Sequence, residues 1–358
     1  MSKKHFSWLL ILSVLVALAA ILLPGRTAKD EVEAWGALVP GLQEKVNDIG
    51  WLKITGGGDE VIVTLQRQDD GWVVQESAAY RADWSRLKPL LSGLASAQVV
   101  EAKTSNPDYF DRLGVQDIAA DDASGYLVEF DPSTGLPAVI IGKRAQGRKG
   151  QYARLDGDTQ SVLVDQQFEL PQDSQGWLDR EIIDIGEAEV VEIEVKHPDG
   201  ATVIARKASA DDRNFVLEGI PGGFKPKSDW SVNSLAGTLA ALNLDSVAPA
   251  AGIDWTGASR FRLLTADGLN TEVELVEISA EQEGESEYWL RLDCSVYTTA
   301  VGSGVDNESG SDTVSERAAE ANRKAAGWAY RVPKYKYDSM VKRMDDLVQP
   351  IEPAEAES

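Results

Sequence analysis

The residues best suited to bind a ligand are the four cations of one short turn, Lys143, Arg144, Arg148 and Lys149. They lie in the segment GKRAQGRKGQ of a chain whose formal net charge is −23. Clustered Lys and Arg side chains can bind phosphate, lipid headgroups or an acidic protein surface. A solvated hairpin tip has the same composition, so the sequence favours a hairpin tip and keeps a contact patch as the alternative.

The sequence offers little material for catalysis or metal binding. The chain has 2 histidines, His5 and His197, and 1 cysteine, Cys294. His197 lies in KHPDG, which is typical of a hairpin turn, and a lone Cys294 forms neither an intramolecular disulfide nor a cysteine-rich metal site. We expect Cys294 to be buried. We therefore predict no catalytic residue, no metal ligand and no cofactor, and a hydrolase would need a convergent nucleophile and base.

The net charge also bears on partners. A chain with a charge of −23 and an isoelectric point of about 4.5 repels the phosphate backbone, so we expect no nucleic-acid partner. Dispersed acidity of this kind is typical of a soluble surface.

The apolar segment 6–24, FSWLLILSVLVALAAILLP, carries no charge. A helix rises about 1.5 Å per residue, so this segment approaches the roughly 30 Å thickness of a bilayer core. Signal-peptide apolar regions are shorter, about 7–15 residues, so we predict an uncleaved signal anchor, with a cleaved signal peptide as the alternative. Lys3 and Lys4 favour a cytoplasmic N-terminus, although Arg26 and Lys29 follow the segment. The expected location is the inner membrane, single-pass, with the C-terminal bulk in the periplasm.

The remaining chain divides into two similar halves. After a linker and juxtamembrane helix at 25–46, residues 47–177 and 178–350 each contain a strand hairpin, a leucine-rich helix and a series of alternating strands. Long crossover helices are missing, which favours an α+β fold with antiparallel sheets. The ordered recurrence of these elements predicts an internal duplication.

The tripeptide Asp-Trp-Ser precedes the helical pattern in both halves. In the first half Trp84, Leu87, Leu91 and Leu94 are spaced as one helical face, and we expect the helix to begin around Ser85 or later. Pro89 would then lie in or near the first turn, with Trp84 as a plug before the helix. In the second half the helical face consists of Val232, Leu235, Leu239 and Leu242.

Two further predictions concern side chains and segments outside this pattern. Residues 301–327 are rich in Ser, Gly and acidic residues, which indicates a solvated, disordered insertion with a short helix at 316–325, and the acidic tail 351–358 is expected to be disordered. We expect five tryptophans in patterned segments to be buried: Trp72, Trp84, Trp230, Trp289 and Trp328.

Several stretches together resemble a known bacterial family. They include LVPGLQEKVNDIGWLKI, GWVVQESAAYRADWSRLKPLLSGLASAQVVEAKTSNPDYFDRLGV, IIGKRAQGRKGQYARLDGDTQSVLV and WLDREIIDI. This order of motifs is similar to that of the DUF4340 family, over most of residues 38–350. The resemblance implies a membrane-anchored protein that often accompanies an ABC-type transporter permease and a gliding-motility-type auxiliary subunit. It implies no catalytic residues.

These observations lead to one functional hypothesis and one alternative. The favoured hypothesis is a non-catalytic, membrane-anchored envelope protein that acts through protein contacts and is accessory to an ABC-type transporter. The alternative is an extracytoplasmic binding module for a carbohydrate or peptide-like ligand, with exposed tryptophans lining a concave pocket.

Overall fold

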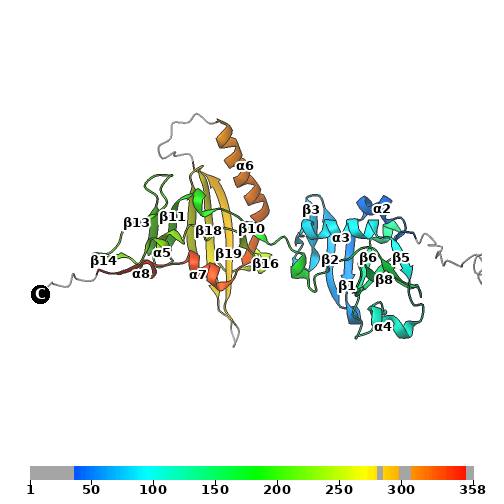
Figure 1. The fold of residues 1–358 in the computed structure, drawn as a ribbon. Coiled ribbons are helices and arrows are strands. Elements are labelled where there is room, and N and C mark those ends of the chain that lie inside the picture. The colour runs from blue at the N-terminus through cyan, green and yellow to red at the C-terminus, as the bar shows by residue number, and fades with distance from the viewer. Residues whose placement is uncertain (1–35, 280–284, 298–307, 352–358) are drawn as a thin grey trace, which may run out of the picture. The chain divides into compact units, whose positions relative to one another are not determined.

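The computed structural model describes residues 36–279, 285–297 and 308–351 (Figure 1). The predicted signal anchor at 6–24 and most of the acidic tail lie outside these residues. Within the described ranges no helix is both long enough and apolar enough to cross a membrane.

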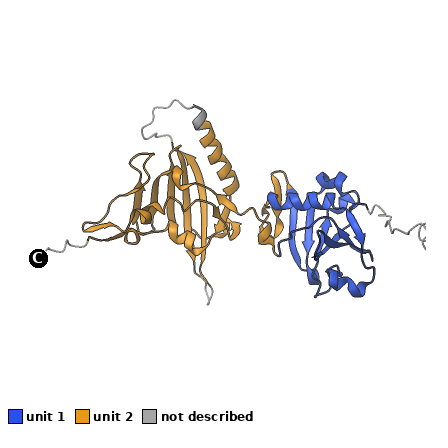
Figure 2. Ribbon diagram, viewed as in Figure 1, with its two compact units in different colours: residues 1–67, 85–172 blue, residues 68–84, 173–358 orange. Residues whose placement is uncertain are grey.

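The chain divides into two compact units (Figure 2). Unit 1 comprises residues 1–67 and 85–172, and unit 2 comprises residues 68–84 and 173–358. The segment 68–84 therefore belongs to unit 2, although it lies within the first half of the sequence.

The first large sheet has nine strands in the order β4-β3-β2-β1-β6-β7-β8-β9-β5. Pairing is antiparallel between β4 and β3, between β2 and β1, and from β1 through β6, β7, β8 and β9 to β5. Alternation along β1 and β2 buries Leu52, Ile54, Val63 and Leu65 completely. The strands are β1 (Trp51–Thr55), β2 (Val61–Gln68), β3 (Gly71–Val74), β4 (Tyr80–Arg81), β5 (Val99–Ala102), β6 (Tyr126–Phe130), β7 (Val139–Arg144), β8 (Gln151–Leu155) and β9 (Ser161–Val164).

Three helices accompany these strands: α2 (Leu42–Lys45), α3 (Trp84–Ser96) and α4 (Phe110–Leu113). Helix α3 buries Leu87, Leu91 and Leu94, as the leucine spacing predicts. Phe110 of α4 joins a separate cluster of buried residues that includes Ile140 of β7.

The start of α3 differs from the sequence-based expectation. The helix begins at Trp84 and contains Pro89 in its interior. Trp84 is 50% exposed, so the prediction that it forms a buried plug is wrong. Trp84 shares the leucine face by its spacing, but a side chain in the first turn of a helix stays accessible unless another element covers it.

The second large sheet has eight strands in the order β13-β12-β11-β17-β18-β19-β20-β16. Its central row pairs Val195 with Phe261 and Phe261 with Val273, all completely buried. The strands are β11 (Val190–Lys196), β12 (Thr202–Arg206), β13 (Val216–Leu217), β16 (Ser246–Pro249), β17 (Ser259–Thr265), β18 (Leu269–Ile278), β19 (Glu287–Val296) and β20 (Trp328–Arg331).

Two short ribbons and four α-helices complete the described residues of unit 2. One ribbon pairs β10 (Glu181–Ile183) with β15 (Leu242–Asn243), and the other pairs β14 (Phe224–Pro226) with β21 (Val348–Pro350). The helices are α5 (Asp229–Asn233), α6 (Glu308–Ala325), α7 (Lys334–Met340) and α8 (Met344–Leu347).

The two large sheets repeat one order of strands. In each sheet the first strand of the series, β1 or β11, pairs with the second strand and with the strand that starts the later meander, β6 or β17. The strand after the helix, β5 or β16, pairs antiparallel with the last strand, β9 or β20. The sheets differ in that β4 joins the first sheet, whereas β14 pairs with β21 outside the second.

The two helices predicted for the second half differ in length from those observed. The expected leucine-rich helix ends at Asn233, and the segment 234–241 continues as turns before β15. The expected disordered insertion contains α6 over Glu308–Ala325, which is longer than the short helix predicted at 316–325. Helix α6 lies along β19, where the Asn322 amide exchanges hydrogen bonds with the Cys294 backbone at 2.7 and 2.6 Å. Asn322 thereby covers a strand edge that β20 leaves unpaired.

Candidate functional site

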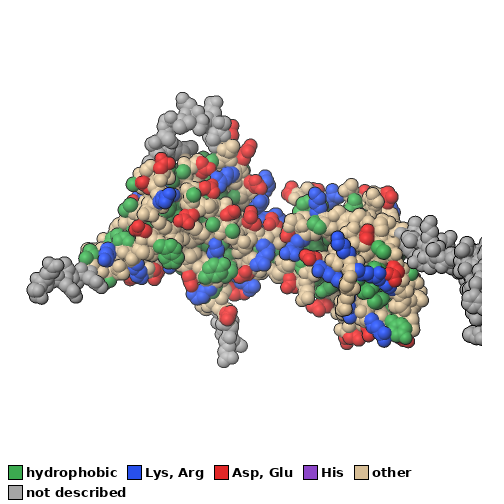
Figure 3. All heavy atoms as spheres, in the orientation of Figure 1, with side chains coloured by type: hydrophobic (Ala, Val, Ile, Leu, Met, Phe, Trp, Pro, Cys, Tyr) green, Lys and Arg blue, Asp and Glu red, His purple; other side chains and the backbone are tan. Residues whose placement is uncertain are grey.

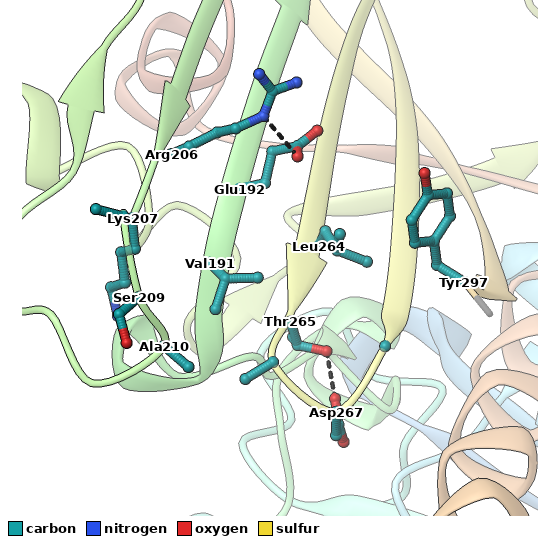
Figure 4. Close-up of a pocket in the computed structure, with 13 residues that line it drawn as sticks. Val191, Glu192, Arg206, Lys207, Ser209, Ala210, Leu264, Thr265, Asp267 and Tyr297 are labelled. Atoms are coloured by element: carbon teal, nitrogen blue, oxygen red, sulfur yellow. Dashed lines mark hydrogen bonds and ion pairs between the residues drawn. The ribbon is translucent and has the colours of Figure 1, made fainter. Parts of the chain in front are cut away.

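A cavity of about 310 Å³ opens beside the second large sheet (Figure 4). It lies where β11, the end of β12 and the turn between β17 and β18 come together. Val191 and Leu264 provide apolar lining, and Tyr297 lies on one side. Cavities that hold drug-sized ligands begin at about this volume, so the site suits a small apolar or aromatic group.

The two acids of this cavity already have hydrogen-bond partners. Glu192 accepts hydrogen bonds from Arg206 Nε at 2.8 Å and from Arg262 Nη1 at 2.7 Å. Burial acts to raise the pKa of Glu192, but the two arginines outweigh it and hold the pKa below its ordinary value. Asp267 accepts hydrogen bonds from Thr265 and from Arg317 Nη1, the latter at 2.9 Å. These acids are therefore not available as free charges for a ligand.

The lining residues include three hydroxyl groups, those of Ser209, Thr265 and Tyr297, and none of the residues that line this cavity is a histidine or a cysteine. The Thr265 hydroxyl donates to the Asp267 carboxylate, which also pairs with Arg317. The volume and the apolar lining support binding of a small group. In the described part of the chain, no group of three or more His, Cys, Asp or Glu side chains could hold a metal ion.

The four cations singled out by the sequence lie on β7 and in the turn that leads to β8, with all four side chains exposed. Arg144 pairs with Glu169 at 3.0 Å, and Arg148 pairs with Glu101 at 2.8 Å. Lys143 donates to the Asp111 carbonyl oxygen at 2.8 Å. The hairpin therefore brings the four cations together, but three of them already bind groups of the same unit.

The tryptophans separate into buried and exposed sets. Trp289 is 6% exposed and belongs to a buried cluster, as expected, whereas Trp230 is 78% exposed. Trp72 and Trp328 are half-buried. The prediction that both Asp-Trp-Ser tryptophans belong to the core is therefore wrong, because each one lies in the first turn of its helix.

Three exposed apolar side chains share one end of unit 2 and form what we call the end patch: Phe224, Trp230 and Ile351. Their exposed fractions are 40%, 78% and 54%. Phe224 lies on β14, α5 contacts β14, and the Ile351 amide donates to the Gly223 carbonyl oxygen at 2.8 Å. Hydrophobic side chains are visible on the surface over β14 and α5 (Figure 3).

Sequence reasoning missed the end patch. Phe224 and Lys225 follow the turn IPGG, an aromatic–cation pair in a segment with no strand periodicity. Ile351 is isolated in sequence at the start of the acidic tail. The only available signal was the aromatic residue beside a proline- and glycine-rich turn, which is typical of exposed tips.

Comparison with known proteins gave one match. A family model described as a domain of unknown function, DUF4340, matches residues 72–256. A search of curated proteins and a search of solved structures each found no match.

Proposed function

This chain belongs to the DUF4340 family, and on that premise we propose that it is a non-catalytic, membrane-tethered protein that acts through contacts with other proteins. The observation that carries this proposal is the end patch. Monomeric surfaces rarely cluster large apolar side chains, and exposed Trp is enriched among residues that dominate binding energy. Trp230, at 78% exposed, would lose most of its water contact on docking.

The tether and its location rest on the sequence. The uncharged segment 6–24 has the length of a membrane span, and the lysines before it favour a periplasmic C-terminal bulk at the inner membrane. A role as an accessory to an ABC-type transporter is supported by the transporter permease that often accompanies members of the family. The geometry of the two units does not bear on this role.

We also propose that the two sheets arose by duplication of one building block. Their matching strand order and the helix that follows Asp-Trp-Ser in both halves support this proposal. A tandem array of similar sheets offers separate surfaces for separate partners.

Photo-crosslinking in native membranes tests the proposal. A photoreactive residue at position 230 is expected to crosslink a defined protein, which mass spectrometry identifies. The matched control is Tyr335, which is 68% exposed on α7 and outside the end patch. Equal crosslinking at both positions, or none at position 230, would overturn the proposal. Recovery of a transporter component would support the accessory role.

A second candidate function is ligand binding in the cavity of unit 2. Its volume of about 310 Å³ and its apolar lining suit a small group. Thermal-shift measurements on the detergent-solubilised chain with simple sugars and dipeptides test it. A shift seen with the wild type and lost in Leu264→Trp, which fills the cavity, supports binding. A shift of equal size in both proteins excludes this cavity.

A further inference from the structure

Strands β4 and β14 hold equivalent positions along the chain, although β4 pairs with β3 in the first sheet and β14 lies outside the second. Each precedes the helix that begins within Asp-Trp-Ser, and each is followed by residues that pair with a later segment, as in the Ala82–Leu178 bridge and the Pro226–Val348 pair. The Asp83 amide donates to the Trp177 carbonyl oxygen at 2.7 Å, and the Lys227 amide donates to the Leu347 carbonyl oxygen at 2.8 Å.

This hydrogen-bond register aligns the two strands residue by residue. Arg81 accepts through its carbonyl oxygen from the Asp179 amide at 3.0 Å, and Lys225 is the register partner of Gln349. Counting back from Asp83 and Lys227 aligns Arg81 with Lys225 and Tyr80 with Phe224. Both strands therefore begin with an aromatic residue followed by a cation, a correspondence that the two-residue offset of Asp-Trp-Ser hides in the sequence.

The first aromatic–cation pair is docked. Tyr80 is completely buried within unit 2, edge-on to Trp328 and Tyr330 with ring centroids 5.0 and 6.2 Å apart. Arg81 Nη1 donates to the Lys324 carbonyl oxygen at 2.5 Å. Because Lys324 is in the last turn of α6, the negative end of the helix dipole adds to the attraction for a cation.

A carboxylate completes this docking site. Arg81 Nε donates to Asp179 Oδ2 at 3.1 Å. The site thus offers an aromatic edge, a carbonyl group at a helix C-terminus and an acid to the aromatic ring and the cation of the docked pair. The Tyr80 hydroxyl accepts from Arg81 Nη2 at 2.9 Å, a bond within the pair that Phe224 and Lys225 lack.

The second aromatic–cation pair is not docked in the described residues. Phe224 is 40% exposed and Lys225 is also exposed. The neighbouring Lys227 differs, because its ammonium group donates to the carbonyl oxygens of Asp345 and Asp346 at 3.1 and 2.9 Å. Lys227 thus stabilises the ribbon, which leaves Phe224 and Lys225 presented together on β14.

We propose that Phe224 and Lys225 dock into a site on a partner chain that has the same chemistry as the site around Tyr80 and Arg81. The partner is therefore another protein with a sheet unit of this family's fold, whose aromatic edge and helix C-terminus are unoccupied. This inference rests on the proposed function and names the partner of the end patch. A second copy of this chain is not the expected partner, because its own Tyr80 and Arg81 fill the one such site that the described residues contain.

Crosslinking from position 224 in native membranes tests the partner's identity. The expected product joins position 224 to an aromatic residue or to the adjoining helix C-terminus in a sheet unit of the same fold. Lys225→Glu is expected to lower the yield about tenfold or more, as removal of a dominant contact does. Reversal of the partner's acid to Lys should restore the yield with Lys225→Glu.

The possible outcomes separate this inference from the proposed function. A product with a protein of unrelated fold leaves the proposed function standing and overturns the inference. A product with lipid, or no product from positions 224 and 230, overturns both. Lys342→Glu is the control for charge reversal outside β14 and should leave the yield unchanged.

A second experiment needs no unidentified partner. The double variant Tyr80→Ala/Arg81→Ala empties the internal site, so Phe224 and Lys225 of another copy can enter it. Sedimentation of the detergent-solubilised chain is expected to show concentration-dependent self-association, which the added substitution Lys225→Glu abolishes. A variant with native-like circular dichroism that stays monomeric would show that the two pairs are not interchangeable and would overturn the inference. If the double variant does not fold, the crosslinking experiment still decides.

Discussion

The two segments that follow Asp-Trp-Ser bury similar ladders of apolar side chains in different backbones. In α3, Leu87, Leu91 and Leu94 lie on one face of a continuous helix. In the segment 229–243, Val232, Leu235, Leu239 and Leu242 are equally buried, but they belong to the short α5, to turns and to β15. Similar hydrophobic spacing therefore led to buried side chains in both segments, but only the first segment forms a continuous helix.

The difference follows from the partners that other segments offer to the second ladder. Helix propensity does not separate the two segments, because α3 contains Pro89 and Gly93 and the segment 229–243 contains Asn233, Gly237 and Thr238. The Asn233 side chain accepts a hydrogen bond from the Phe215 amide at 3.0 Å and so is bound to a neighbouring segment. Lys336 of α7 donates to the Thr238 and Ala240 carbonyl oxygens at 3.2 and 3.1 Å, which supplies partners that a helix would have provided internally.

The largest loss of stability is expected from truncating a buried leucine in each of the two apolar ladders. Leu94→Ala in α3 and Leu239→Ala in the turns remove completely buried side chains. Each should lower the free energy of unfolding of its unit by about 2–5 kcal/mol. Hydrogen-exchange mass spectrometry under denaturant measures the two units separately. Val61→Ala, at a residue 47% exposed, is the control. A much smaller loss of unfolding free energy for Leu239→Ala than for Leu94→Ala would show that the turns are loosely packed. That result would contradict the conclusion that the two ladders are buried alike.

The next effect concerns the external hydrogen bonds to the turns. Lys336→Met keeps the apolar stem but leaves two carbonyl groups without this donor, and should destabilise unit 2 by about 1–3 kcal/mol. Lys334→Met, which removes an exposed ion pair with Asp338 on the same helix, should change stability by less than about 0.5 kcal/mol. Equal effects of the two substitutions in denaturant titrations would contradict the role assigned to Lys336.

A matched pair of glycine substitutions should give opposite signs. Ala241 has φ of 43°, in the left-handed region, so Ala241→Gly should stabilise unit 2 by about 0.5–1 kcal/mol. Ala95 is inside α3, so Ala95→Gly should destabilise unit 1 by about 1 kcal/mol. Urea titrations of the two variants measure both changes in the free energy of unfolding. A loss of stability in Ala241→Gly would contradict backbone strain at Ala241.

The smallest effect is a pH dependence at Lys336. Burial lowers the pKa of Lys336 below its ordinary value of 10.5, so the unfolded chain binds more protons between the two pKa values. The stability contributed by this group therefore rises with pH in that window. The stability difference between the wild type and Lys336→Met should widen as the pH rises from neutral towards 10.5. A difference that stays constant or narrows would contradict burial of this ammonium group.

The sequence predicted the architecture more completely than the surfaces. Strand alternation and turn residues predicted antiparallel sheets with few helices, because period-two burial is a local property of each strand. The spacing correctly predicted that the leucines and Val232 of the two ladders are buried, and it was wrong for Trp84. It did not predict the length of α5, because Lys336 and Phe215, which bind the turns, are distant in sequence.

The candidate sites show the same limit. The cations Lys143 to Lys149 were found from composition, but their ion pairs with Glu101 and Glu169 depend on other segments. The cavity beside β11 and β17 has no motif, because it consists of ordinary side chains brought together by sheet pairing. The end patch was missed because the exposure of a side chain depends on which other segments cover it. The residue type alone does not show whether an aromatic side chain is buried or exposed.

By itself, the sequence determined the family, the antiparallel α+β class and the side chains that enter the cores, since these depend on local periodicity and residue type. Only the tertiary structure decided that Tyr80 is covered and Phe224 is exposed, although each begins an equivalent strand followed by a cation. The physical reason is that burial of an aromatic ring depends on the surfaces that other segments bring to it. Trp328, Tyr330 and the end of α6 meet Tyr80, and the described residues leave Phe224 partly in water.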